Sequence, residues 1–155
     1  MRIALDTSVL VAGLMQSHPH FATASPWLEA LDGGQIEGFW TTHAYAESWA
    51  VLTRMPTADR ILGADALRVL ESLVAIVPPT PLGFTEYRAA AQRASDAGGR
   101  SGLVFDALHL VAAEADGADA FLTYNVTDFQ RLKPAIVVAA PQADVADFRI
   151  RHGFE

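Results

Sequence analysis

Short apolar runs alternate with helical patterns along this chain, and this alternation restricts the fold more than any other feature of the sequence. The runs have the length of buried strands and span 2–5, 38–41, 74–77, 120–123 and 136–139. The longer stretches between them carry helix caps at their start and Gly or Pro at their end. Strands that alternate with helices predict an α/β domain. We expect a three-layer sandwich in which helices flank both faces of a five-stranded, mostly parallel sheet.

Individual cap and stop residues set the expected helix boundaries. Asp6-Thr7-Ser8 provides cap chemistry for the first helix. Ser25 and Pro26 predict the start of the second, because Pro is favoured at the first helical position. Thr42 is expected to cap the third helix, and Met55-Pro56 to stop it. Further helices are expected over 64–75, 84–97 and 102–116, and Asp128 is a candidate cap for a short helical turn.

Length and composition limit the class of protein. The 155 residues are typical of one domain, so we expect a single domain over 1–155. The absence of cysteine excludes disulfides and thiolate metal sites. The N-terminus has no basic region followed by a long apolar run, and the apolar run from Val9 to Met15 is too short to cross a bilayer. We expect a soluble, cytoplasmic protein without a membrane anchor.

Three carboxylates stand inside otherwise apolar segments that are far apart in the chain. Asp6 closes the first apolar run, while Glu47 and Asp106 have mostly apolar neighbours three and four positions away on their helices. Acidic side chains are seldom buried unless something offsets their charge. Because the carboxyl ends of parallel strands form the usual ligand edge of such a sheet, we expect the three acids to gather there around a cation.

Each acid taken singly also has a structural explanation. Asp6 could simply cap the first helix. Glu47 could extend to solvent or pair with Arg54 or Lys133. Asp106 could be a partly exposed residue that favours a helix N-terminus. The coincidence of all three favours a metal site over three separate explanations.

Hard oxygen ligands favour Mg²⁺, with Mn²⁺ as a substitute, over Zn²⁺. The five histidines show no zinc spacing, and His43 and His109 are interpreted as polar helix residues near the site. Magnesium held by carboxylates takes its other ligands from water and phosphate, so the site predicts phosphoryl chemistry. The formal net charge of −7 does not suggest a large basic surface for nucleic acid.

Four segments in order resemble the motifs of the PIN-domain family. They are 3–10, 41–56, 105–113 and 122–129, and together they cover nearly the whole chain. The size suits the VapC-type toxins of bacterial toxin–antitoxin pairs. The resemblance implies a PIN-like fold and a Mg²⁺- or Mn²⁺-dependent endoribonuclease that cuts RNA with a metal-activated water. It also implies a homodimer and an antitoxin that blocks the site.

The resemblance assigns roles to particular residues. Asp6, Glu47 and Asp106 match the three acidic positions of the family, with Asp6 and Asp106 as metal ligands and Glu47 acting on the water. Thr7, Ser8 and Thr123 are expected to hold these groups through hydrogen bonds, although Thr7 and Ser8 could belong only to the helix cap. Arg100, in the loop before Asp106, is a candidate contact to the RNA backbone or a solvated loop residue.

The fourth motif departs from the family pattern. Asn125 stands where Asp is frequent, so one negative charge is missing, although its carbonyl can still accept a hydrogen bond from metal-bound water. Asp128 could supply a carboxylate instead. Tyr124 replaces a frequent Arg and would weaken a phosphate contact. The alternative function is therefore a PIN-fold interaction module with a weak or lapsed site.

Two other interpretations depend on what the sequence lacks. An aspartyl phosphatase needs a second Asp where Ser8 stands, and a dinucleotide-binding domain needs a glycine-rich turn after the first strand. The segment 141–155 could contact a second copy or an antitoxin, or it could pack on the sheet as a tail.

Overall fold

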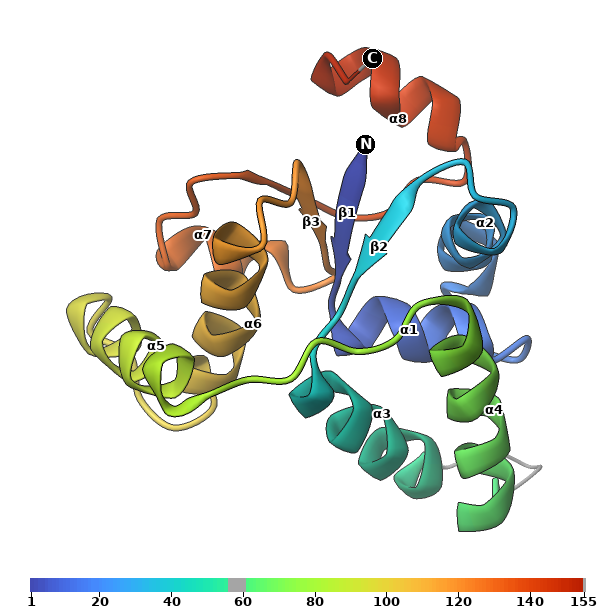
Figure 1. Ribbon diagram of the computed structural model, residues 1–155, viewed down its shortest axis with the longest axis horizontal. Helices are drawn as coiled ribbons and strands as arrows, with labels where there is room; N and C mark the ends of the chain where they lie inside the picture. Colours follow the sequence, from blue (N-terminus) through green and yellow to red (C-terminus); the bar gives the residue numbers. More distant parts are fainter. Residues whose placement is uncertain (56–60, 155) are drawn as a thin grey trace.

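Four parallel strands form the sheet in this computed structural model, which describes residues 1–55 and 61–154. The strands are β1 (Arg2–Leu5), β2 (Glu37–Phe39), β3 (Ala120–Leu122) and β4 (Val137–Ala139). Their spatial order is β2-β1-β3-β4, with β1 at the centre of the view in Figure 1. Ile3 pairs with Gly38 on one side and with Ala120 on the other. Because all the strands run the same way, their carboxyl ends meet at one edge of the sheet.

The predicted fifth strand at 74–77 is wrong. Residues up to Ile76 complete helix α4 (Gly63–Ile76), and Val77 is its C-terminal cap. The buried residues Ala66, Leu70 and Leu73 recur at helical spacing, so the apolar run is the end of a helix face and not a strand. Next to β2, the segment that follows α4 makes only one parallel bridge, between Thr41 and Thr80.

Helices fill the connections between the strands. Besides α4, the structure has α1 (Thr7–Leu14), α2 (Phe21–Asp32), α3 (Thr42–Arg54), α5 (Phe84–Asp96), α6 (Leu103–Ala115), α7 (Val126–Arg131) and α8 (Val145–His152). None of the helices in the described ranges is both long and apolar enough to cross a membrane.

Three predicted boundaries were wrong. Helix α2 begins at Phe21 and has Pro26 in its interior, because the His20 carbonyl already accepts the first helical hydrogen bonds. Thr41, and not Thr42, caps α3 by accepting from the Ala44 N–H at 3.0 Å. Asp128 lies in the first turn of α7, whose N-cap position belongs to Asn125. Pro56, the predicted stop of α3, lies outside the described residues.

The strands bury both faces, which produces three layers. Ile3 and Leu5 of β1 pack on one side with α1, α2 and α8, while Ala4 packs on the other side with α5, α6 and α7. This alternation follows from the two-residue period of a strand. Figure 1 shows the sheet between these two groups of helices. The predicted α/β sandwich with a parallel sheet flanked by helices is confirmed in this form, with four strands.

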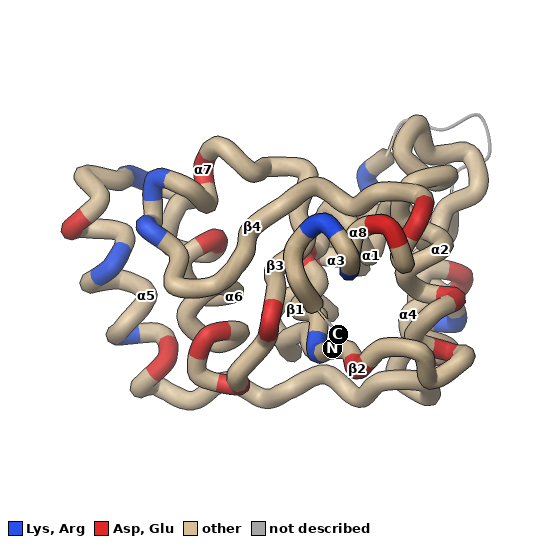
Figure 2. Tube along the Cα trace, turned by 90° about the horizontal axis from the view of Figure 1, so that it is seen from above, with Lys and Arg blue, Asp and Glu red and all other residues tan. Residues whose placement is uncertain are grey.

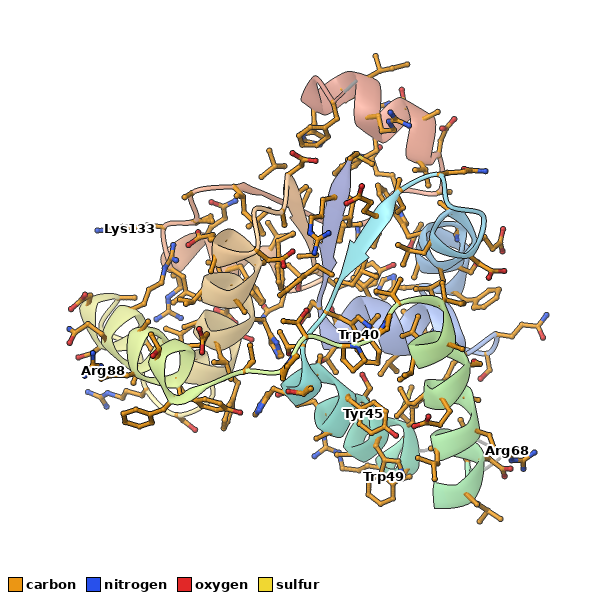
Figure 3. All side chains as sticks on the ribbon, viewed as in Figure 1. Trp40, Tyr45, Trp49, Arg68, Arg88 and Lys133 are labelled. Carbon is orange, nitrogen blue, oxygen red and sulfur yellow. The ribbon has the colours of Figure 1, made fainter. Side chains whose placement is uncertain are left out.

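A third apolar cluster joins α3 and α4 to the sandwich. Val11, Leu52 and Leu70 meet there, and the neighbouring Trp40 donates its indole N–H to the Val77 carbonyl at 2.7 Å. Figure 3 labels Trp40 at the junction of β2 with these helices. Charges lie mainly outside these clusters, and Figure 2 shows several Lys and Arg positions at the end of the molecule formed by α5 and α7. The packing fixes where α3 and α6 present their acidic side chains.

Candidate active site

The three predicted acids meet at the carboxyl edge of the sheet. Asp6 directly follows β1, Glu47 projects from α3 and Asp106 belongs to the first turn of α6. Glu47 and Asp106 both line two adjoining hollows, and Asp6 lines the second of them. The fold therefore gathers three carboxylates that are far apart in the chain, since Glu47 and Asp106 follow Asp6 by about 40 and 100 residues.

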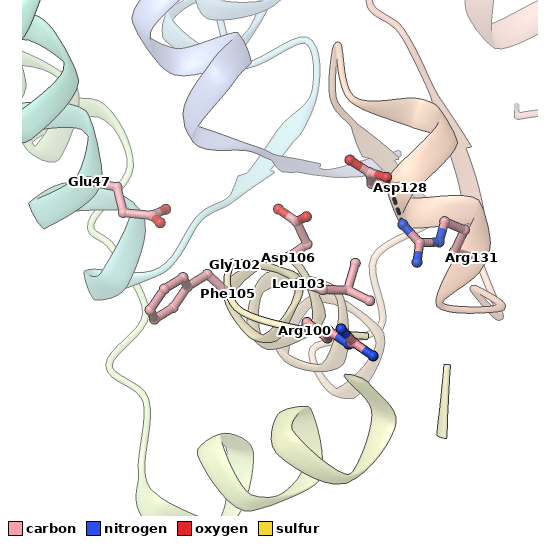
Figure 4. Close-up of a pocket in the computed structure, with 8 residues that line it drawn as sticks. All are labelled: Glu47, Arg100, Gly102, Leu103, Phe105, Asp106, Asp128 and Arg131. Carbon is pink, nitrogen blue, oxygen red and sulfur yellow. Dashed lines mark hydrogen bonds and ion pairs between the residues drawn. The ribbon is translucent and has the colours of Figure 1, made fainter. Parts of the chain in front are cut away.

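We name the two hollows after an aromatic residue in each wall. The Phe105 hollow has a volume of about 420 Å³ and includes Arg100, Phe105, Asp128 and Arg131 besides Glu47 and Asp106. Figure 4 shows the carboxylates of Glu47, Asp106 and Asp128 along this hollow, with Arg100 on the opposite side of α6 from Glu47. The Tyr124 hollow has a volume of about 580 Å³ and includes Asp6, His20, Arg54, Tyr124 and Asn125.

Neighbouring hydroxyls hold the Asp6 carboxylate. Asp6 is only 7% exposed, and its Oδ2 accepts from Ser8 Oγ at 2.6 Å and from Thr123 Oγ1 at 2.9 Å. The Ser8 N–H also donates to Oδ2, at 3.4 Å, so Asp6 caps α1 as the simpler explanation expected. Among the described residues, no hydrogen bond reaches Oδ1. One oxygen thus serves the fold, and the other remains available to a ligand.

A second set of hydrogen bonds fixes Glu47. Its Oε2 accepts from Thr7 Oγ1 at 2.8 Å and from His109 Nε2 at 2.8 Å. The alternative explanation paired Glu47 with solvent, Arg54 or Lys133, whereas these two hydrogen bonds come from Thr7, one of the residues expected to hold the site groups, and from His109. Because a carboxylate only accepts, Nε2 of His109 must carry the proton.

The other ring nitrogen of His109 is also engaged. Its Nδ1 lies 3.0 Å from Thr41 Oγ1, which already accepts from the Ala44 N–H. The Thr41 hydroxyl proton is then available for Nδ1, so both ring nitrogens have a hydrogen-bond partner. His109 is only 2% exposed and therefore cannot exchange these partners for water. The chain Thr41–His109–Glu47 orients the carboxylate.

Sequence reasoning placed His109 near the site but missed its contact with Glu47. A buried His among apolar residues one turn after Asp106 was the available signal. It pointed to a need for polar partners but not to which ones. His43 also approaches Glu47, with 3.5 Å between Nε2 and Oε1, and burial lowers its pKa.

The acids perturb one another. Burial and then the charge of Asp6 raise the pKa of Asp106 to about 6, and Asp128 and Glu47 add to this rise. Burial alone would raise the pKa of Glu47 too, but hydrogen bonds from His109 and Thr7 and the neighbouring histidines lower it below its ordinary value. At neutral pH the edge therefore carries concentrated negative charge, and burial and the neighbouring acids disfavour the ionised form of Asp106.

The fourth motif brings two polar side chains to the site. Asn125 lines the Tyr124 hollow with Asp6, and its N–H donates to Thr123 Oγ1 at 3.0 Å. Asp128 lines the Phe105 hollow and pairs with Arg131 at 3.3 Å. Asn125 therefore lines the hollow that contains Asp6, whereas Asp128 lines the other hollow.

The donor set suits a hard divalent ion more than a closed metal cage. Within residues 1–55 and 61–154, no three His, Asp or Glu side chains stand close enough to enclose an ion. Mg²⁺ does not need such a cage, since it is commonly held by one or two carboxylates with water and phosphate filling the other positions. Asp6, with one uncommitted oxygen, and Asp106, whose ionised form is disfavoured by burial and by the other acids, fit that role.

Comparisons with known proteins agree with this architecture. Ribonuclease VapC27 of Mycobacterium tuberculosis is 31% identical over 117 residues, which cover 76% of this chain and 80% of that protein. VapBC2 from Rickettsia felis, solved bound to a DNA fragment from its promoter, superposes with a TM-score of 0.65 at 16% identity, covering 90% of this chain and 98% of that chain. VapC20 of M. tuberculosis, titled a sarcin–ricin loop cleaving toxin, gives 0.62 at 17% identity, with coverages of 87% and 98%.

The structural matches show the fold, and the sequence matches show the family. A family model described as the PIN domain matches residues 3–133, which include Asp6, Glu47, Asp106 and Asn125. The match to a ribonuclease covers most of both sequences. This chain belongs to the PIN-domain family.

Proposed function

We propose that this protein is a metal-dependent endoribonuclease that acts as the toxin of a toxin–antitoxin pair. The observation that carries the proposal is the convergence of Asp6, Glu47 and Asp106 at one edge, with Glu47 held by Thr7 and His109. Three carboxylates serve no structural purpose together, because each raises the cost of ionising the others. The relationship to ribonuclease VapC27 supports RNA as the substrate.

Asp6 and Asp106 are the residues that would hold Mg²⁺, or Mn²⁺ in its place, in the proposed mechanism. When bound, such an ion would supply positive charge against the phosphate oxygens and would make a water molecule easier to deprotonate. Ser8 and Thr123 keep Asp6 in position, and Thr7 and His109 do the same for Glu47. Asn125 orients water at the open side of Asp6.

Glu47 takes the proton from the attacking water in the hydrolytic step. The water oxygen bonds to phosphorus, one bridging P–O bond breaks, and the departing oxygen leaves with a proton from solvent or from protonated Glu47. The lowered pKa of Glu47 keeps it ionised and able to accept. Arg100 contacts the RNA backbone beside the site, and Asp128 is a secondary candidate for the carboxylate that completes the site.

The partners follow by analogy with the structural relatives. Structures of VapBC2, and of VapBC-1 from Haemophilus influenzae, bear names of toxin–antitoxin complexes. We infer an antitoxin for this chain that covers the carboxylate edge, and a homodimer of the 155-residue domain. Light scattering of the purified chain tests the homodimer, and a monomer at micromolar concentration would contradict it.

The test is RNA cleavage by the purified protein with Mg²⁺, with Mn²⁺ and with EDTA. We expect cleavage with either metal and none with EDTA. Asp6→Asn should reduce cleavage by at least about 100-fold without loss of the folded state. Asp32→Asn is the matched control, because it makes the same chemical change at an exposed position on α2.

Two results would contradict the proposal. Cleavage that persists in EDTA excludes the metal mechanism, and a fully active Asp6→Asn variant removes Asp6 from the site. The toxin role has its own measurement, which is growth after induced expression. Growth arrest with the wild type and not with Asp6→Asn supports it, whereas unaffected growth with an active nuclease contradicts it.

A further inference from the structure

Each of the two hollows carries a supported aromatic ring beside the carboxylates. In the Phe105 hollow, the Phe105 ring stacks on His43 with 5.1 Å between ring centroids and 18° between planes. In the Tyr124 hollow, the Tyr124 ring stacks on His20 at 4.2 Å and 16°. Because Glu47 and Asp106 line both hollows, the two aromatic pairs flank the acids.

Phe105 is not explained by packing. It is 45% exposed, although its neighbours Leu103 and Ala107 on α6 are buried. His43 supports its ring, and His43 in turn meets the ring of Tyr87 edge-on at 6.3 Å. A large apolar ring that is fixed on one side and open to a hollow offers a flat surface for a planar ligand. Figure 4 shows it beside Glu47.

Hydrogen bonds hold Tyr124 in place in the Tyr124 hollow. Its hydroxyl shares a hydrogen bond with Thr23 Oγ1 at 2.6 Å and donates to the His20 carbonyl at 3.2 Å. Its backbone N–H donates to Ser8 Oγ, which itself donates to Asp6. The ring is therefore tied to the acid that begins the site.

Arginines complete both hollows. Arg100 and Arg131 line the Phe105 hollow, and Arg54 lines the Tyr124 hollow. Arginine side chains bind phosphate oxygens through paired N–H groups. The acids between them repel a polyanion, and the chain has a net charge of −7, so charge alone gives little affinity for RNA. Base stacking, which does not depend on charge, can supply what the electrostatics lack.

We propose that the two hollows are nucleotide subsites for single-stranded RNA on either side of the scissile phosphate. One base stacks on Phe105 and another on Tyr124, while Arg100 and Arg54 hold the phosphates that flank the cleaved one. This inference rests on the proposed ribonuclease function and adds to it the two residues of this chain that position the bases beside the cleaved bond. Bases in a duplex cannot turn out onto both rings, so paired RNA is excluded from the site.

The test measures stacking directly. Single-stranded RNA 12-mers, each with 2-aminopurine at a different position, are titrated with the protein in Mg²⁺. The protein carries Glu47→Gln, which keeps Asp6 and Asp106 but suppresses hydrolysis. We expect fluorescence quenching at two positions that flank the cleavage site. Phe105→Ala should abolish quenching at one of them and Tyr124→Ala at the other, each weakening binding about tenfold. Tyr124→Phe should keep the quenching.

Matched controls separate local from general effects. Phe84 is 80% exposed at the start of α5 and lines neither hollow, so Phe84→Ala should leave quenching and affinity unchanged. Arg88 lies on α5 at the outer end of the molecule in Figure 3, so Arg88→Ala is the control for Arg100→Ala. An abasic site in place of the quenched base should weaken RNA binding by the wild-type rings. It should cause no further loss of affinity in the alanine variant that lacks the matching ring.

The outcomes distinguish this inference from the proposed function. Wild-type protein that cuts no RNA overturns the ribonuclease itself. Wild-type protein that cuts RNA, with Phe105→Ala and Tyr124→Ala equal to Phe84→Ala in quenching and affinity, overturns only the subsites. Equal cleavage of a duplex and its single strand also overturns them. Loss of antitoxin inhibition with unchanged RNA binding would assign the rings to the antitoxin instead.

Discussion

His109 is a buried residue outside the carboxylate set, and we expect it to influence the proposed chemistry through Glu47. Its Nε2 donates to Glu47 and its Nδ1 meets Thr41, so the ring links the N-cap of α3 to the Glu47 carboxylate. We expect His109→Ala to lower kcat by about 10- to 100-fold with little change in KM, because Glu47 loses its orientation but substrate binding does not involve His109. His109→Gln should restore most of the rate, since its amide N–H can donate to Glu47.

Steady-state kinetics on a defined RNA, with thermal unfolding as a check on the fold, measures this effect. Thr41→Ser keeps the hydroxyl and should remain near wild type, whereas Thr41→Val removes it and should resemble a milder His109→Ala. Equal activity of His109→Ala and wild type would show that Thr7 alone orients Glu47.

We expect the ionised carboxylate of Asp106 to lower the stability of the folded protein, although the proposed function needs that carboxylate. The pKa of its carboxyl in the folded, metal-free protein is about 6, above the ordinary value of 3.8. A folded-state pKa that is raised for an acid means that stability falls as the pH rises from about 4 to about 6, and stays reduced above 6. Asp106→Asn removes this penalty. After allowance for solvent screening at a half-buried group, we expect a gain of about 1 kcal/mol at pH 8.

Urea unfolding in EDTA at pH 8 and at pH 4 measures this gain, which should vanish at the lower pH. The same variant should bind Mg²⁺ weakly and fail to cut RNA. A gain that is equal at both pH values would trace to packing or hydrogen bonding and not to the buried charge.

Asn125 allows the missing charge of the fourth motif to be restored. Asn125 faces the hollow that contains Asp6, so Asn125→Asp adds a carboxylate on the open side of the proposed metal site. We expect tighter Mg²⁺ binding, on the order of tenfold, by isothermal titration calorimetry, and lower stability in EDTA because a further like charge is added. Unchanged affinity in calorimetry would mean that Asn125 does not approach the ion.

At the scale of elements, α8 shows what the C-terminal segment does. Phe148 of α8 is fully buried and meets the Trp27 ring edge-on at 4.9 Å, while the Trp27 indole donates to the Gln142 carbonyl at 2.8 Å. The expectation that the segment 141–155 packs against the rest of the domain is therefore supported for the side of α8 that carries Phe148. We expect Phe148→Ala to cost about 3–5 kcal/mol in urea unfolding.

The opposite side of α8 provides the control. Ile150 is 78% exposed, so Ile150→Ala should change the free energy of unfolding by less than about 0.5 kcal/mol. A similar small change for Phe148→Ala would mean that α8 is held by a partner and not by its own core. Retained nuclease activity in Ile150→Ala would also separate α8 from the carboxylate edge.

The spacing of apolar residues predicted helices and strands well where it fitted only one of the two. The strands at β1, β3 and β4 follow from short apolar runs, and Asp6, Thr123 and Asn125 follow from their place at strand ends. The run at 74–77 failed because four apolar residues fit a strand and the end of a helix equally well. Only the packing of Leu70 and Leu73 decides between the two.

The links between elements could not be predicted in the same way. Thr7–Glu47 and Glu47–His109 join residues 40 and 62 positions apart, and a single sequence contains no signal for such pairs. The Asp106 pKa likewise depends on four groups that the fold brings together. Sequence therefore identified which residues are chemically unusual, while the tertiary packing determined which of them act on one another.

For the whole molecule, the charge distribution predicts how RNA binding responds to salt. The chain carries a net charge of −7, and three arginines line the two hollows: Arg54, Arg100 and Arg131. Each phosphate neutralised on single-stranded RNA contributes about 0.7 to the slope of log K against log salt. Because the proposal assigns phosphates to two of them, Arg54 and Arg100, we expect a shallow slope of about −1.4 for the Glu47→Gln protein in fluorescence anisotropy.

Single substitutions separate this prediction from a general charge effect. Arg100→Ala should reduce the slope by about 0.7, whereas Arg88→Ala, which changes the net charge equally, should leave it unchanged. The affinity that remains at high salt should belong to the rings, so Phe105→Ala should weaken binding at every salt concentration without altering the slope. A slope steeper than about −4 would require a basic surface outside the two hollows and would place the RNA elsewhere on the molecule.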